Sequence, residues 1–149
     1  MNLSEHFTLE ELTFSEYATR QAIDNTPSQQ VIENLILLCT HILEPFRALI
    51  QLPLIITSGY RSITVNADIG GSSTSQHCEG KAADFHVSGL TVQQVYDKVK
   101  NSKLPFDQLI QEFNQWTHAS YNSESNRRMC LIATHVNGKT VYTNDGVIQ

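Results

Sequence analysis

The sequence predicts an α+β fold in which helices pack against a small antiparallel sheet. Helical periodicity dominates the early part of the 149-residue chain, and short β-rich segments cluster later. The pair Asn137-Gly138 lies between two of these segments and is typical of a two-residue hairpin turn, which joins antiparallel strands. Hydrophobic residues make up 40% of the chain. This composition and length fit one core and a single domain over residues 1–149.

Three patterns predict helices. Residues 8–11 (TLEE) fit a capping box and begin a short helix. Thr26-Pro27 fits an N-cap followed by proline in the first turn, and it opens the longest helix, whose apolar face reaches Leu49. Pro45 lies inside this pattern and has no N–H, so we expect a kink or a break there. Residues 91–94 (TVQQ) form a second capping box and open a helix that runs to about residue 100.

The remaining segments are predicted as strands and loops. Residues 62–76 are rich in Ser, Thr, Gly, Asn and Asp, and we expect them to form an exposed loop. β-Branched and aromatic residues predict strands at 54–57, 82–87, 109–113, 117–120, 130–134 and 140–142.

Charge and composition exclude several classes of function. The net charge is −5 and no run of Lys and Arg occurs, so no nucleic-acid partner is expected, and the pair Arg127-Arg128 is predicted to lie on a solvated surface. No apolar stretch approaches the roughly 18 residues of a membrane span. The N-terminus lacks a basic and apolar leader, which predicts synthesis in the cytoplasm. The cysteines, at 39, 78 and 130, are expected to be reduced thiols.

Two predicted strands each carry polar side chains on one face. Side chains alternate along a strand, so Asp84 and His86 share one face of the segment AADFHV, and the apolar Phe85 and Val87 share the other. The same alternation places Trp116, His118 and Ser120 on one face of the segment WTHAS.

The stretch SQHCEGKAAD, residues 75–84, has two interpretations. In one, His77 and Asp84 join His118 in a zinc site, because two imidazoles and one carboxylate suit an ion with an open position. Gly80 then permits the tight turn between the first two ligands. In the other, His77 caps a turn and Asp84 binds nearby backbone amides.

The chain resembles the M15 family of zinc peptidases, the D-alanyl-D-alanine carboxypeptidase-like enzymes that include phage endolysins. The resemblance runs from about Leu3 to Tyr121. It rests on the motifs SGYRS, SQHCEGKAADF, FDQLIQEF and WTHAS, and the segment HFTLEELTFSE is similar to the small phage-borne branch. It implies a Hedgehog/DD-peptidase-like fold and a Zn²⁺ ion held by His77, Asp84 and His118.

The resemblance also implies substrate contacts. Arg61 matches the family arginine near the scissile carbonyl, and a fixed guanidinium suits an oxyanion or a peptide carboxylate. Ser75 and Gln76 match positions that contact the C-terminal end of the substrate.

The general base is predicted to be Glu112. Many family members have an acid three residues before the second histidine ligand, but this chain has Gln115 there, which cannot accept a proton from water. Glu112 shares strand parity with His118, unless a bulge at residues 114–115 intervenes. Asp107 and Glu79 are the alternatives.

Several further residues have less direct interpretations. His86 either binds a metal ligand from outside the coordination sphere or lies on the surface. Cys78 is expected to point away from the ion, and Trp116 to pack in the core or line a pocket. The remaining histidines, at 6, 41 and 135, are expected to be structural or solvated.

Two functional hypotheses follow. The first is a zinc metallopeptidase that cuts peptidoglycan stem peptides, as a carboxypeptidase or endopeptidase, and reaches the cell wall after lysis. The second is a metal-containing but non-catalytic domain that binds peptides or cell wall, or forms part of a virion, and Gln115 in place of an acid favours it. The bond that is cut and the oligomeric state stay open.

Overall fold

The computed structural model describes residues 1–147 as a six-stranded sheet with helices on both faces. The strand order is β1-β2-β4-β3-β5-β6. The strands are β1 (Ile55–Ser58), β2 (Ala82–His86), β3 (Gln108–Glu112), β4 (Trp116–Ser120), β5 (Met129–Val136) and β6 (Lys139–Val147). The α-helices are α1 (Leu9–Thr13), α2 (Glu16–Gln21), α3 (Gln29–Leu38), α4 (Glu44–Ile50), α5 (Ile63–Asp68) and α6 (Val92–Lys100). A π-helical turn, η1 (Cys39–Leu43), and a 3₁₀ turn, η2 (Gln76–Glu79), complete the set.

The α+β class is confirmed, but the prediction of an antiparallel sheet is wrong for one strand pair. β3 and β5 are parallel, and the other four pairs are antiparallel. β4 pairs with β2 and β3, which leaves β1 and β3 at the edges, and β5 adds at β3. The long connection between β4 and β5 allows the chain to return and enter that edge in the same direction as β3.

The long predicted helix begins later than expected and continues past Pro45. Ser28, not Thr26, is the N-cap, and its hydroxyl accepts a hydrogen bond from the Val31 N–H at 3.2 Å. Pro27 therefore lies outside the helix. Pro45 has no N–H, and its ring would clash with a carbonyl four residues earlier. The π-turn η1 widens the helix just before Pro45, with the Glu44 N–H donating to the Cys39 carbonyl, so the chain stays helical from residue 29 to 50.

The prediction of a loop over residues 62–76 is wrong for its first half, which contains α5. The Ser62 hydroxyl caps this helix by accepting from the Val65 N–H at 3.2 Å. Asn66 is buried, and its side-chain amide donates to the Ser72 carbonyl at 2.8 Å. Ser62 and Asn66 thus cap and tie the backbone, which composition alone does not reveal, whereas most of residues 62–76 are exposed as expected. Helix α2 was also not predicted.

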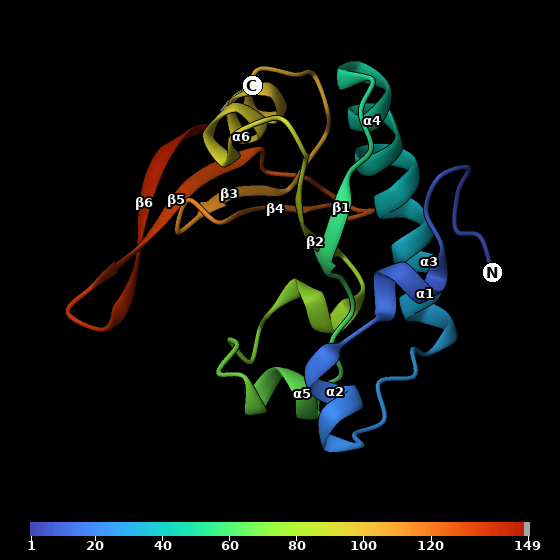
Figure 1. Cartoon of the computed structure of the whole chain (residues 1–149). Coiled ribbons are helices and arrows are strands. Elements are labelled where there is room, and N and C mark those ends of the chain that lie inside the picture. Colours follow the sequence, from blue (N-terminus) through green and yellow to red (C-terminus); the bar gives the residue numbers. More distant parts are fainter. Residues whose placement is uncertain (148–149) are drawn as a thin grey trace.

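The two faces of the sheet have different roles. Phe85, Leu109 and Ala119 are fully buried on the face covered by α3, α4 and α6. Alternation places Asp84 and His118 on the opposite face. Figure 1 shows α6 above β3 and β4, and α5 below them.

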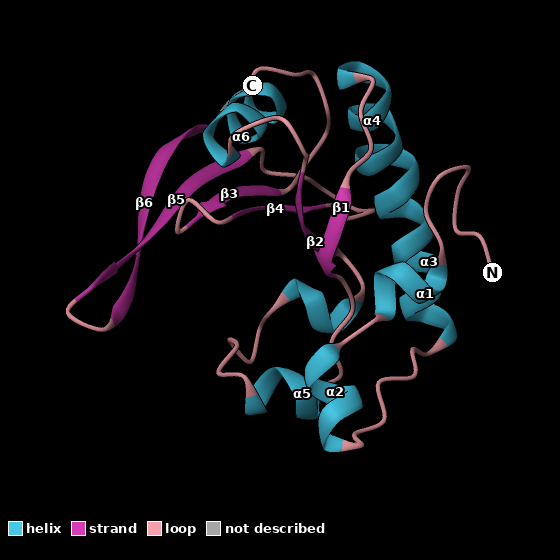
Figure 2. Ribbon diagram, viewed as in Figure 1, coloured by secondary structure: helices cyan, strands magenta, loops and turns pink. Residues whose placement is uncertain are grey.

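The last two strands form a long hairpin. Both turn residues, Asn137 (φ 51°) and Gly138 (φ 76°), have the positive φ of a two-residue hairpin turn, which confirms that prediction. Figure 2 shows β5 and β6 extending past the other strands, away from α3 and α4. Within residues 1–147, no helix has the length and apolar character that crossing a bilayer requires. All three cysteines are free thiols, as predicted.

Candidate metal centre

His77, Asp84 and His118 converge from three separate elements. Each offers a ligand atom, these atoms all lie within 4.8 Å of one another, and all three residues are buried. His118 Nδ1 lies 2.9 Å from Asp84 Oδ1, and His77 Nε2 lies 3.3 Å from the same oxygen. Asp84 and His118 are directly opposed on β2 and β4, so strand pairing sets their separation. His77 joins them from η2.

A capped 3₁₀ turn delivers His77 to this point. The Ser75 hydroxyl accepts a hydrogen bond from the His77 N–H at 3.2 Å and caps η2. Gly80 ends the turn at φ +72°, and a Cβ there would lie 2.7 Å from the Val31 carbonyl oxygen. Both features favour glycine, because the backbone is left-handed and packs directly on α3. The predicted need for Gly80 thus has a second cause, the contact with α3.

A backbone carbonyl orients the His77 ring. His77 Nδ1 lies 2.8 Å from the Gly59 carbonyl oxygen, which can only accept, so Nδ1 carries the proton. Nε2 therefore presents its lone pair toward Asp84. A Cβ on Gly59 would lie 2.1 Å from the Leu12 carbonyl oxygen, so only glycine allows this approach. Sequence analysis left this outer position open for His86, with a surface location as the alternative, and the hydrogen bonds of the described residues give the position to Gly59.

Electrostatics prepare Asp84 and His77 as ligands, whereas the raised pKa of His118 favours a proton that a metal would displace. Burial raises the pKa of Asp84, but His77 and His118 outweigh it and hold the pKa well below its ordinary value. Burial lowers the pKa of His77, which keeps that ring neutral. Burial also lowers the pKa of His118, but the hydrogen bond and charge of Asp84 outweigh it and raise the pKa. A neutral imidazole, a carboxylate and a second imidazole held by that carboxylate match the donors of an open zinc site.

Glu112 lies beside these donors. Its Oε1 is 3.5 Å from His118 Nδ1, and its side chain is 16% exposed. Burial raises its pKa above the ordinary carboxyl value. The turn after β3 spans residues 113–115, and Glu112 pairs directly with Trp116, so the shared parity with His118 is kept. Gln115 is exposed on this turn.

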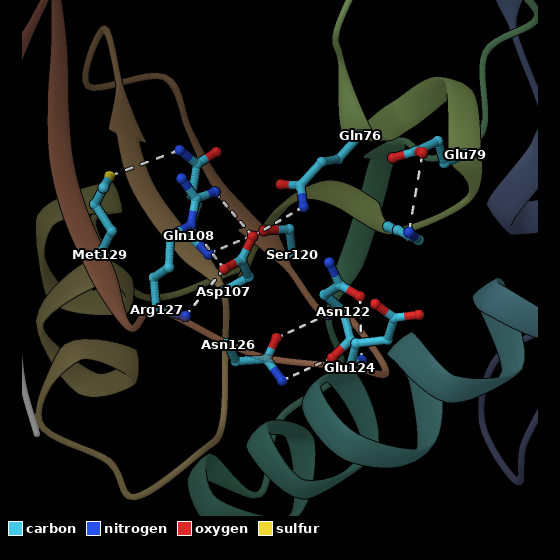
Figure 3. A network of polar contacts seen from close by, with 11 residues as sticks. Gln76, Glu79, Asp107, Gln108, Ser120, Asn122, Glu124, Asn126, Arg127 and Met129 are labelled. Carbon is cyan, nitrogen blue, oxygen red and sulfur yellow. Dashed lines mark hydrogen bonds and ion pairs between the residues drawn. The ribbon is translucent and has the colours of Figure 1, made fainter.

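The two alternative acids do not face the donors in this way. Asp107 accepts from the Arg127 guanidinium at 2.9 Å through each of its oxygens, and from Gln76 Nε2 at 3.0 Å. Figure 3 shows Gln76, Asp107 and Arg127 pointing toward one another. Glu79 is 56% exposed and lies 3.9 Å from Lys81 Nζ. Asp107 is thus committed to hydrogen bonds, and Glu79 faces solvent.

A cavity of about 860 Å³ opens over the metal centre. Three polar atoms of its lining residues are buried without a hydrogen-bond partner: Arg61 Nε, Gln76 Oε1 and Trp116 Nε1. Because Asp107 only accepts, the hydrogen bond from Gln76 Nε2 fixes the amide with Oε1 free as an acceptor. Buried polar atoms without partners are rare in proteins, so these three are positions for a polar ligand. Ser75 also lines the cavity, although its hydroxyl already caps η2.

Some residues near the cavity had no signal in the sequence. Leu131, Thr140 and Tyr142 line it from β5 and β6. Arg127 is exposed, as expected, and its guanidinium also pairs with Asp107. Arg128 was also expected on a solvated surface, but its guanidinium lies 4.5 Å above the Phe106 ring and donates to the Ser102 carbonyl. These contacts join segments whose approach depends on the strand order.

The remaining candidates fall outside the donor group. Cys78 is not among the three grouped residues of the described chain. His41 stacks on Tyr121, His135 stacks on Phe113, and His6 pairs with Glu44. Trp116 is half-buried in the cavity wall, with its ring edge-on to Phe113.

Comparison with known proteins places this geometry in a family. The family whose sequence model matches is peptidase M15, and the match covers residues 5–120. A search of curated proteins found no match. The matched segment contains all three grouped residues and Glu112. The chain therefore belongs to the peptidase M15 family.

Proposed function

We propose that this protein is a zinc-dependent peptidase that hydrolyses peptide bonds in the stem peptides of peptidoglycan. One observation carries the proposal: a buried His-Asp-His group has its ligand atoms within 4.8 Å of one another, and the half-buried carboxylate of Glu112 lies 3.5 Å from His118. Membership of a peptidase family supports the reaction type.

The donor set fits Zn²⁺. His77, Asp84 and His118 would hold the ion with two nitrogens and one oxygen and leave a position open. When bound, the ion would acidify water and polarise a peptide carbonyl. The Gly59 carbonyl keeps Nε2 of His77 available as a ligand.

Glu112 would move the proton. A carboxyl with a raised pKa is a better acceptor for a water proton at neutral pH than an ordinary one. Glu112 would take a proton from the attacking water and then give it to the departing amine nitrogen. The water oxygen forms the new bond to the carbonyl carbon, and the bond from that carbon to nitrogen breaks, so the proton count balances.

The buried polar atoms without partners would hold the substrate. Arg61 would donate to the oxygen that gains negative charge in the transition state. Gln76 Oε1 would accept from a substrate N–H, and Ser75 would contribute beside it. The contacts of Arg61 and Gln76 would each satisfy an atom that the free protein leaves unpaired.

The test is digestion of purified peptidoglycan by the zinc-loaded protein, followed by mass spectrometry of the fragments. We expect new peptide termini, their loss with a chelator, and their return when zinc is added. Glu112→Gln should lower turnover by about 10²-fold or more and leave bound zinc, measured by elemental analysis, unchanged.

Other outcomes would contradict this assignment. Full activity in Glu112→Gln would move the base to another residue. Bound zinc without any new termini would favour the non-catalytic, wall-binding hypothesis. The structure gives that hypothesis no added support, because Gln115 is exposed on the β3–β4 turn and does not line the cavity.

A further inference from the structure

We propose that Tyr142, on the C-terminal hairpin, forms a second wall of the substrate groove and selects an uncharged aliphatic side chain next to the cleaved bond. This inference rests on the proposed function. It assigns a role to β6, which lies outside the segment matched by the family, residues 5–120.

The position of Tyr142 follows from strand register. Tyr142 pairs with Ala133, Ala133 pairs with Glu112, and Glu112 pairs with Trp116. Residues that are directly opposed on neighbouring strands point to the same face of a sheet. This row of four residues, which we call the Glu112 row, therefore faces the metal centre, with Tyr142 two strands, about 10 Å, from Glu112.

Ala133 lies beneath the cavity wall and does not line the cavity. It is fully buried and carries only a methyl group between Tyr142 and Glu112. Tyr142 lines the same cavity as Glu112 and Trp116. Burial and the negative charges of Glu112 and Asp84 raise the pKa of the Tyr142 hydroxyl. This agrees with a Tyr142 ring that lies on the same face of the sheet as these two carboxylates. The ring is still 54% exposed, so it offers surface to a ligand.

The chemistry of this wall limits what it can accept. Leu131 and Thr140 line the cavity beside Tyr142, and Ile110 pairs with Leu131 at its floor. These side chains carry no charge, and the carboxylate of Glu112 closes one end. The negative charge of Glu112 would repel an acidic side chain there, and the uncharged wall would accept an aliphatic one.

The experiment has a readout that does not depend on catalysis. Trp116 is the single tryptophan of the chain and belongs to the Glu112 row, so its fluorescence reports on ligands in the groove. Muropeptides, prepared by muramidase digestion of peptidoglycan, are titrated into zinc-loaded Glu112→Gln protein, with and without Tyr142→Ala. The same muropeptides give kcat and KM in the background with intact Glu112.

We expect Tyr142→Ala to raise both the dissociation constant and KM about tenfold, equivalent to about 1.4 kcal/mol, with kcat within about twofold. Tyr142→Phe keeps the ring and should stay near wild type. Val141→Ala is the matched control, because Val141 is the neighbouring residue on the other face of β6 and is 40% exposed. Synthetic peptides that carry alanine or glutamate at each position flanking the cleaved bond test the selectivity. At one of these positions, wild type should prefer alanine over glutamate, and Tyr142→Ala should show a smaller preference.

The outcomes separate this inference from the proposed function. Cleavage by wild type, with KM and dissociation constant unchanged in Tyr142→Ala, would overturn the inference alone. An equal loss in Val141→Ala would also overturn it, because it would point to damage of the hairpin. If Tyr142→Ala weakens binding but no variant cleaves the muropeptides, the role of Tyr142 as a groove wall is supported and the proposed peptidase function is overturned. If the protein neither binds nor cleaves the muropeptides, both the inference and the proposed function are overturned.

Discussion

At the scale of single residues, the geometry of the site depends on atoms that have no chemistry of their own in the proposed reaction. The Gly59 carbonyl fixes the tautomer of His77, and Asp107 fixes the amide of Gln76, which precedes His77 in η2. Both partners lie far from His77 in sequence. Such contacts outside the coordination sphere orient the metal ligands, and their loss commonly lowers metal affinity or activity.

Asp107 should contribute to stability in a pH-dependent way. Burial raises its pKa, but hydrogen bonds from Arg127 and Gln76 outweigh it and hold the pKa below the ordinary 3.8. A carboxyl with a depressed folded-state pKa stabilises the protein above its unfolded-state pKa, and this contribution is lost as pH falls through the folded-state pKa. Asp107→Asn should therefore lower the free energy of unfolding at pH 7 by about 1 kcal/mol, a modest value because Arg127 is 51% exposed.

Urea denaturation at pH 7 and pH 3 measures this effect. The difference between wild type and Asp107→Asn should shrink at pH 3. A difference that stays constant with pH would show that the carboxyl acts through shape and not through charge. Asp97→Asn, on the exposed surface of α6, is the matched control.

At the scale of elements, caps set where helices start and so what they bury. The Thr91 hydroxyl accepts from the Gln94 N–H at 3.0 Å, and Gln94 Oε1 accepts from the Thr91 N–H at 2.9 Å. This capping box, predicted from sequence, is confirmed. It opens α6, whose buried face carries Val95, Tyr96 and Val99.

Thr91→Ala should lower the free energy of unfolding by about 1 kcal/mol, because the Gln94 N–H has no acceptor within the helix and loses the Thr91 hydroxyl. The expected fall in Tm is roughly 2–4 °C for a chain of this size, measured by thermal unfolding. Thr91→Ser keeps the hydroxyl and should stay near wild type. An equal loss in both variants would assign the effect to the threonine methyl group.

At the scale of the whole molecule, the candidate metal centre joins distant parts of the chain. Its ligands come from η2, β2 and β4, which are brought together only when the sheet forms. An ion that binds the folded state and not the unfolded chain stabilises by mass action.

Zinc at about 1,000 times its dissociation constant should therefore add about 4 kcal/mol to the free energy of unfolding. Thermal unfolding with zinc and with chelator should differ by roughly 10 °C. His118→Ala should abolish the shift. His86→Ala should retain it, because His86 lies on the same strand as Asp84 but outside the ligand group. A full shift in His118→Ala would place the ion elsewhere.

Local features that the sequence carries directly were largely predictable. The capping boxes at Thr8 and Thr91, the Asn137-Gly138 turn and the alternation along β2 depend on contacts within a few residues, which sequence spacing expresses. The choice of His77, Asp84 and His118 as one set came from residue types and family resemblance, and the structure places them together.

Tertiary structure alone decided the rest. β5 adds at β3 and not at β1, and this parallel pair brings Ala133 and Tyr142 into line with Glu112. The close approach of Gly59 to Leu12 and the pairing of Asp107 with Arg127 likewise join segments that are distant in sequence. Periodicity and spacing report which face of an element is buried, but not which element covers it, because that depends on the packing of the whole chain.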